Sequence, residues 1–358
     1  MKKRVAVGVM TGMLAMGSIG LAGAHAQGSL QLTVLGTPVQ GDSAPIVVSG
    51  RVLVPIRVVT EKLGGTVNWD AAKGTVTASK WSDSVKLTVG QKKAVLVRNG
   101  QKPATVSLDA PARLVRDRVY IPLRFVSETF GYGVDWDGAT ASVRSPFSVN
   151  VQNVLASGSL DKARQLMLNL GQLRYKHEPL AVRHDSEYWG ETFLFPEGEA
   201  LRYYSITGDT ATRIEITDGM AVAVWQAHVK EDDAVAQFLK GQWTDARGDN
   251  PPISKVYYSY AAGGWGDSHE ETVSRIDLQG NSTVLGYKRE VGGDITNQEG
   301  TIAYALPDET RKEVVSFTPA PAAATASAAV QPGVSIDFPS GEDADEQAAP
   351  DLATPSPK

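Results

Sequence analysis

The chain has 358 residues, contains no cysteine and carries a formal net charge of −5 at pH 7. The missing cysteines exclude disulfides, thiolate nucleophiles and cysteine-based metal sites, and the acidic balance argues against nucleic acid or an anionic membrane surface as a partner. At about 100–200 residues per domain, the chain has room for two domains and a tail.

Residues 1–26 are typical of a secretory signal peptide. Three basic residues at positions 2–4 precede an apolar stretch, and Ala24-His25-Ala26 fits an A-x-A cleavage site. Cleavage after Ala26 leaves a mature chain that begins at Gln27, and the loss of three cations changes the net charge from −5 to −8. No second apolar run approaches the roughly 20 residues of a membrane helix, so we expect no membrane contact after cleavage. The expected location is secreted or extracellular, including association with the cell wall.

The next part of the chain contains an internal repeat. The segment VLVPIRVVTEKLGGTVNWD, residues 52–70, is followed at an offset of 67 residues by VYIPLRFVSETFGYGVDWD, residues 119–137. The matched positions keep this offset without a gap, and self-similarity of this kind defines a structural unit. The repeats extend over about 45–79 and 112–145.

Each copy of the repeat predicts a short helix. Pro55 and Pro122 suit its first turn, where a missing N–H costs nothing, and Gly64 and Gly131 suit the residue after its last turn. Apolar residues at i, i+3 and i+7 form a stripe that we expect to face the core. They are Ile56, Val59 and Leu63 in the first copy and Leu123, Val126 and Phe130 in the second.

Charged and aromatic residues also recur in both copies. Arg57 with Glu61, and Arg124 with Glu128, lie four residues apart, and we interpret both pairs as solvated helix surface rather than as ligand-binding groups. After each helix, apolar residues alternate with polar ones as in a strand. We predict that Trp69 and Trp136 in these strands are core anchors, with a ligand platform as the alternative.

Further hairpins are expected around the helices. Residues 45–54 and 112–121 each have two apolar runs about a polar turn. Between the copies, residues 84–97 alternate around Gly90-Gln91, and Asn99-Gly100 is a strong turn signal. The predicted unit is a hairpin, a short helix and a strand, present twice.

The doubled motif with the Asn99-Gly100 turn between its copies resembles the copper amine oxidase N-terminal-like domain, also called the stalk domain. The resemblance covers about residues 30–146. It implies antiparallel strands curled around a helix, in secreted and wall-associated proteins of Gram-positive bacteria. In the oxidases the stalk is separate from the domain that holds copper and the quinone cofactor. We therefore assign residues 27–146 to a stalk domain without a cofactor.

Residues 147–318 predict a second, antiparallel β-rich domain. Phe147–Ser157 has the pattern of a last strand or connector, and Ser159–Arg174 that of a capped helix. From Thr192 the apolar period becomes two, which is typical of a meander. The expected strands are 192–195, 200–206, 210–216, 220–228, 253–260, 272–278, 283–291, 301–306 and 312–317, with a helix at about 231–240 on the sheet. The fold class is thus α+β, with one or two helices here and short helices in the stalk.

Residues 319–358 are rich in Ala, Pro and acidic residues. They contain too little apolar surface to order the backbone, so a disordered tail is expected. The tail has no sorting-signal pattern, and we expect no covalent attachment to the wall.

The residue inventory argues against an oxidase. Its quinone forms from a Tyr that follows an Asn, and its copper ligands include an H-x-H pair, but no Tyr follows an Asn here and the five histidines form no such pair. Two segments are dense in possible metal donors: His184, Asp185 and Glu187, and Asp267 to Glu271. Neither has zinc-protease or calcium-loop spacing, so we interpret both as solvated loops. No catalytic, cofactor-binding or metal residue is assigned.

Aromatic residues cluster in the second domain at 188–189, 203–204 and 257–260, and at Trp265. Exposed aromatic faces suit sugar rings or peptides, whereas alternation along strands places one member of each pair in the core. Trp265 lies in a glycine-rich loop and is the least easily explained as core.

These observations favour an exported, non-catalytic surface or cell-wall-associated binding or scaffold protein. The expected partner is a cell-wall polymer or another surface protein. The alternative is a secreted hydrolase that acts on wall glycan or peptide through carboxylates such as Glu187, Glu191 or Glu270. A purely structural or regulatory partner of a neighbouring protein is the third possibility.

Overall fold

A computed structural model describes residues 30–40, 44–170, 173–183, 189–230 and 233–313. The predicted signal peptide, the mature N-terminus at Gln27 and the tail from 319 lie outside these residues. The described residues belong to one compact unit. No helix among them is long and apolar enough to cross a membrane.

The two predicted helices of the repeat are present. Helix α1 spans Ile56–Lys62 and helix α2 spans Leu123–Thr129, each preceded by its proline. Gly64 and Gly131 follow with φ of +77° and +84°, the left-handed conformation that ends a helix and that glycine adopts without strain. The core-facing stripes are buried as predicted.

The predicted hairpins before the helices form one sheet. Strand β3 (Ile46–Val48) pairs with β4 (Arg51–Pro55), and β10 (Arg113–Val115) pairs with β11 (Arg118–Pro122). Strands β4 and β11 pair with each other in antiparallel register, giving the order β10-β11-β4-β3. The two copies of the repeat thus meet along these strands.

A five-stranded antiparallel sheet follows the first helix. Its strands are β5 (Thr66–Asp70), β6 (Thr75–Lys80), β7 (Asp83–Thr88), β8 (Lys93–Val97) and β9 (Ala104–Ser107), paired in chain order. Asn99 and Gly100, between β8 and β9, both have positive φ, as their turn signal predicts.

The second copy contributes β12 (Gly133–Trp136) and β13 (Thr140–Arg144) to a separate sheet. Strand β13 pairs in parallel with β1 (Gln31–Val34), which in turn pairs with β2 (Thr37–Pro38). The sequence signals did not predict this parallel pairing, because β1 and β13 are far apart in the chain.

The start of the second region differs from the prediction. Val149–Ala156 forms helix α3 instead of a strand or connector, and Ser148 caps it by accepting a hydrogen bond from the Val151 amide at 3.3 Å. Helix α4 spans only Leu160–Leu168, because Arg174 and Tyr175 already belong to strand β14, which pairs in parallel with a later strand.

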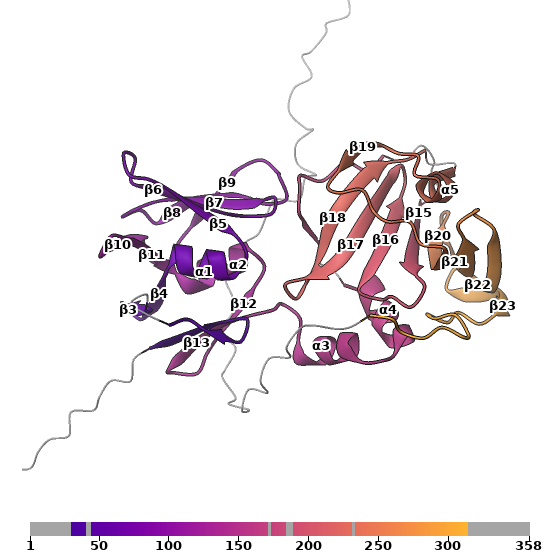
Figure 1. Cartoon of the computed structure of the whole chain (residues 1–358), viewed down its shortest axis with the longest axis horizontal. Coiled ribbons are helices and arrows are strands. Elements are labelled where there is room, and N and C mark those ends of the chain that lie inside the picture. The colour runs from indigo at the N-terminus through magenta and orange to yellow at the C-terminus, as the bar shows by residue number, and fades with distance from the viewer. Residues whose placement is uncertain (1–29, 41–43, 171–172, 184–188, 231–232, 314–358) are drawn as a thin grey trace, which may run out of the picture. The chain divides into compact units, whose positions relative to one another are not determined.

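The predicted meander is confirmed as a large sheet in the order β14-β18-β17-β16-β15-β20-β21-β22-β23 (Figure 1). The strands are β15 (Trp189–Pro196), β16 (Arg202–Thr207), β17 (Thr210–Thr217), β18 (Met220–His228), β20 (Val256–Gly264), β21 (Ser268–Asp277), β22 (Ser282–Val291) and β23 (Asp294–Gly300). Strand β19 (Thr244–Arg247) pairs with β18, and helix α5 is Ala234–Leu239.

The predicted strand at 301–306 is wrong, because the edge position beside β22 is taken by β23. Residues 301–306 contain no strand, and of the strand predicted at 312–317 only positions 312 and 313 are described, also without strand structure.

Hydrophobic side chains cover both faces of this sheet. On one face, helices α3 and α4 pack over Phe195, Tyr203 and Tyr258. On the other, Phe238 of α5 packs against Tyr204 and Trp225. The prediction that the second helix packs on the sheet is therefore confirmed.

The stalk region and the β-rich region share buried contacts. Met220, Val222 and Val224 of β18 belong to the same hydrophobic cluster as the stalk helices. Two ion pairs of opposite polarity join the hairpin between β6 and β7 to the second region: Lys80 Nζ lies 2.8 Å from Asp218 Oδ2, and Asp83 Oδ2 lies 2.9 Å from Arg174 Nη1. The domain boundary at residue 146 stays a prediction.

Candidate functional site

A groove of about 360 Å³ lies on the outer surface of the first repeat. One side is formed by Arg57, Val58 and Glu61 of helix α1, and its floor includes Val67 and Trp69 of β5. Arg57 Nε is 3.8 Å from Glu61 Oε1 and both side chains are exposed, as expected of a solvated pair. The groove thus combines an aromatic surface with two opposite charges.

The other side of this groove comes from the second repeat. It is formed by Asp117, Arg118 and Val119, at the turn between β10 and β11. Arg116 and Asp117 have φ of +46° and +59°, so the turn has the tight geometry that suits a two-residue hairpin. The sequence repeat did not indicate this contribution, because it arises from the pairing of β11 with β4.

The same groups recur in the second copy. Arg124 Nε lies 3.8 Å from Glu128 Oε1, and the corresponding tryptophan is Trp136. Burial raises the pKa of the Glu128 carboxyl despite the attraction of Arg124. The Arg–Glu pairs on the two helices thus have the same separation.

The two tryptophans are not equivalent in burial, and the prediction that Trp136 is a core anchor is wrong. Trp69 is partly buried against the stalk core, but Trp136 remains 45% exposed. The difference follows from the hairpin after each tryptophan. Trp69 pairs with Val76 and is followed by one more residue of its five-residue strand. Trp136 is the last residue of β12 and pairs with Ala141 beside a shorter turn.

The carboxylates considered for hydrolysis do not meet. Glu191 of β15 pairs with Ala262 of β20, which pairs in turn with Glu271 of β21, so Glu191 and Glu271 lie on the same face of the sheet. Glu270 is the neighbouring residue of β21. Because successive residues of a strand face opposite sides of the sheet, Glu191 and Glu270 point to different faces. Glu187 lies outside the described residues.

Each described carboxylate of this group has its own partner. Ser205 Oγ donates to Glu191 Oε1 at 2.5 Å, and Glu270 Oε1 lies 3.4 Å from Arg289 Nε. Burial alone would raise the pKa of Glu271, but hydrogen bonds from Lys288, His269 and Tyr260 together lower it. Glu271 is therefore a charged member of an ion-pair network and unsuited to donate a proton at neutral pH.

The segment Asp267–Glu271 is not a loop, because β21 begins at Ser268. The strand separates its donors between the two faces of the sheet. Among the described residues, no group of three or more His, Asp or Glu could hold a metal ion. The other candidate, His184 with Asp185 and Glu187, lies outside the described residues.

The paired tyrosines do not form exposed platforms. Tyr203 and Tyr204 are both buried, one on each face of the sheet, and Tyr257 and Tyr258 repeat this arrangement. Trp265 is 61% exposed at the turn between β20 and β21, in agreement with the expectation that it is not core. Among the residues whose side chains the structure describes, the exposed tryptophans are thus Trp136 and Trp265, with Trp69 in its groove. The predicted aromatic pair at 188–189 lies outside them.

Residues 33–145 match the model of a known family, the copper amine oxidase N-terminal domain. The match is confined to the stalk region, which confirms the resemblance seen in the repeat. The match is to the non-catalytic N-terminal domain of those oxidases alone. No curated protein matches the chain.

Proposed function

We propose that the protein is an exported, non-catalytic binding protein whose stalk region attaches to a polymer of the cell wall and presents the β-rich region. The observation that carries the proposal is the duplication, in one folded unit, of a surface that joins a tryptophan to an Arg–Glu pair. The first copy is the groove at Trp69, Arg57 and Glu61, and the second copy has the corresponding residues in an exposed Trp136 and the Arg124–Glu128 pair.

A repeated surface suits a repeated ligand. Aromatic faces pack against sugar rings, and the neighbouring arginine and glutamate can exchange hydrogen bonds with hydroxyl or amide groups. Two linked sites on one chain bind a polymer more tightly than either site alone, because the second contact is intramolecular. A wall polymer offers such repeats, whereas a protein partner presents one copy of its surface.

The arrangement of the carboxylates supports a role without catalysis. The pair that a glycoside hydrolase would need is divided between the two faces of the sheet at Glu191 and Glu270, and each is engaged by another side chain. Glu191 and Glu271 do share a face, so hydrolysis through that pair is the alternative that the experiment includes.

The test uses the whole mature chain from Gln27, because Met220, Val222 and Val224 complete the stalk core and a stalk fragment would lack them. The protein is sedimented with purified Gram-positive cell walls while released sugar and peptide are measured. Trp136→Ala is expected to weaken retention about tenfold, the change that 1.4 kcal/mol produces. Trp265→Ala is the matched control, an exposed tryptophan outside the stalk region, and should leave retention unchanged.

Equal retention of the Trp136→Ala and Trp265→Ala variants would refute polymer binding through the repeat. Absence of wild-type retention would direct the search to a surface protein as partner. Release of sugar or peptide that is lost in Glu271→Gln would establish the hydrolase alternative instead.

A further inference from the structure

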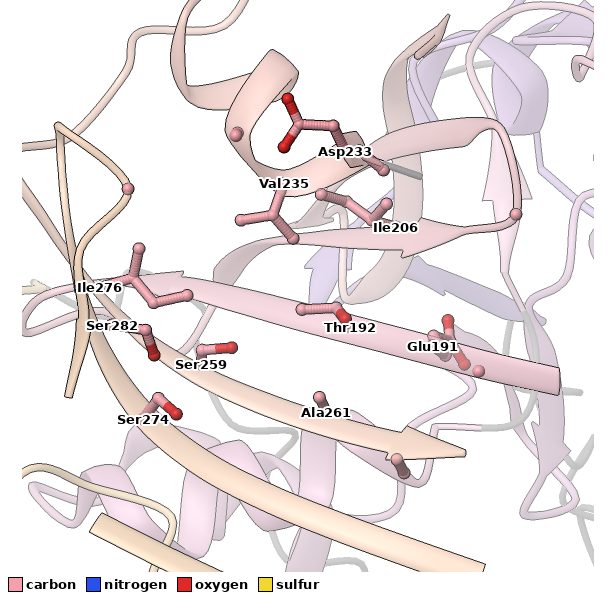
Figure 2. A pocket seen from close by; sticks show the side chains of 16 residues that line it. Glu191, Thr192, Ile206, Asp233, Val235, Ser259, Ala261, Ser274, Ile276 and Ser282 are labelled. Carbon is pink, nitrogen blue, oxygen red and sulfur yellow. The ribbon is translucent and has the colours of Figure 1, made fainter. Parts of the chain in front are cut away.

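We infer that the β-rich region contains a separate binding site for a small neutral or cationic sugar. The site is a cavity of about 540 Å³ between helix α5 and the strands β15, β20 and β21 (Figure 2). This volume lies within the range of small-molecule sites, about 300–1,000 Å³. The inference does not rest on polymer binding by the stalk.

The cavity is created by a decrease in side-chain size along β20. On the face that α5 covers, alternate residues are Tyr257, Ser259, Ala261 and Gly263. Tyr257 is fully buried against Phe238 of α5, with ring centroids 6.3 Å apart. The following positions are too small to fill the same layer, so the space beside the helix stays open.

Buried hydroxyls line the floor of this cavity. Ser259 and Ser274 are direct cross-strand partners with 4% and 5% exposure, and Ser282 lies beside them (Figure 2). No side-chain hydrogen bond joins the Ser259 or Ser274 hydroxyl to another described residue, and neither oxygen is fully enclosed by protein. Both hydroxyls are therefore open to the cavity and can donate to or accept from a polar ligand.

The walls define the rest of the ligand. Ile206, Val235 and Ile276 offer aliphatic surface on which the C–H groups of a sugar ring can pack (Figure 2). Thr192 adds a further hydroxyl on β15. A serine or threonine hydroxyl both donates and accepts, which matches the hydroxyls of a sugar. The combination of hydroxyl floor and aliphatic wall therefore fits a hydroxyl-rich ring of monosaccharide or disaccharide size.

The charge of the lining limits the ligand further. Asp233 lies at the rim, and no lysine, arginine or histidine is among the described residues that line the cavity. Glu191 also borders the cavity, but its carboxylate accepts from Ser205, on the opposite face of the sheet. An anionic sugar would meet no counter-charge here, whereas an amino sugar would be attracted to Asp233.

The test titrates the mature chain with glucose, glucosamine and glucuronate at low salt, by saturation-transfer NMR and calorimetry. We expect saturable binding of glucose and glucosamine, with glucuronate weaker than both. Ser259→Ala and Ser274→Ala should each weaken binding about three- to tenfold, the effect of one neutral hydrogen bond. Ala261→Leu, which fills the cavity, should abolish it.

Ser205→Ala is the matched control, because Ser205 is also a buried serine of this sheet but faces away from the cavity. It should bind sugar as the wild type does, and so should Trp136→Ala, which keeps this result distinct from wall retention. The inference is overturned if none of the three sugars binds up to about 10 mM, if glucuronate binds best, or if Ser259→Ala and Ala261→Leu bind like the wild type.

Discussion

Val54 and Ile121 face each other across strands β4 and β11, and they are the same position in the two copies of the repeat. The neighbouring pairs are exchanged in the same way: Leu53 pairs with Pro122, and Tyr120 with Pro55. The copies are therefore related by an approximate two-fold axis between Val54 and Ile121. The repeat is a pair of facing units and not two consecutive ones, so the second copy completes the groove of the first.

The two repeat tryptophans should differ in their contribution to stability. Trp69→Ala removes a ring that packs on the stalk core and should lower the free energy of unfolding by about 2 kcal/mol. Trp136→Ala removes a half-exposed ring and should change it by under about 0.5 kcal/mol. Urea denaturation of both variants measures the difference, and equal losses would mean that Trp136 is also a core residue.

The buried ion pair between Arg164 and Glu309 should be important for the β-rich region. Arg164 contacts Glu309 in a bidentate arrangement at 2.6 and 2.7 Å, with both side chains fully buried. Arg164→Met leaves the carboxylate buried without its partner, which should cost about 3–5 kcal/mol in chemical denaturation. Arg289→Ala, which breaks the exposed pair with Glu270, should cost under about 1 kcal/mol. Similar values for the two variants would contradict this assignment.

The same pair should make stability depend on pH. Burial would raise the pKa of Glu309, but the hydrogen bonds from Arg164 and from the amides of Gly198 and Leu306 lower it overall. Because the folded pKa is below the unfolded value of about 4.3, the contribution is present above that pH and is lost as pH falls through the folded pKa.

Glu309→Gln should therefore be less stable than the wild type at pH 7, and the two proteins should converge as the pH falls below about 4. Denaturation midpoints at several pH values between 7 and 3 give the comparison. A difference that stays constant over this range would show that Glu309 acts through packing rather than charge.

Gly131 should tolerate no side chain, for a reason beyond its backbone. A Cβ there would lie 2.8 Å from Nη2 of Arg174, which cannot move freely because it pairs with Asp83 in a buried site. Gly138 also has positive φ, but a Cβ there would meet nothing within 4 Å. Gly138→Ala should cost about 1 kcal/mol of backbone strain, and Gly131→Ala at least about 2 kcal/mol more. Equal thermal unfolding midpoints would contradict a clash with Arg174.

Local sequence signals were sufficient for much of the fold. Proline before the repeat helices, glycine after them and Asn99-Gly100 between strands act through steric limits that involve only neighbouring residues. The strands of the meander were likewise predictable, because apolar and polar residues alternate along each strand and neighbouring residues face opposite sides of the sheet. The helix at Val149–Ala156 was missed because its three valines favour strand, and the cap at Ser148 and packing on the sheet override that preference.

The candidate sites depended on information that no local pattern contains. The division of Glu191 and Glu270 between faces follows from the register of β15, β20 and β21, and the exposure of Trp136 follows from the length of the next turn. The decrease in side-chain size along β20 is visible in the sequence, but a cavity exists only because α5 lies over these small residues.

The sequence by itself determined the duplicated unit, its helices and turns, and the absence of an oxidase inventory, because these depend on residue identity and short-range sterics. Only the tertiary structure decided which strands pair, which side chains share a face and where buried charges such as Arg164 and Glu309 meet. Those outcomes depend on contacts between segments far apart in the chain, whose geometry is set by the packing of the whole unit.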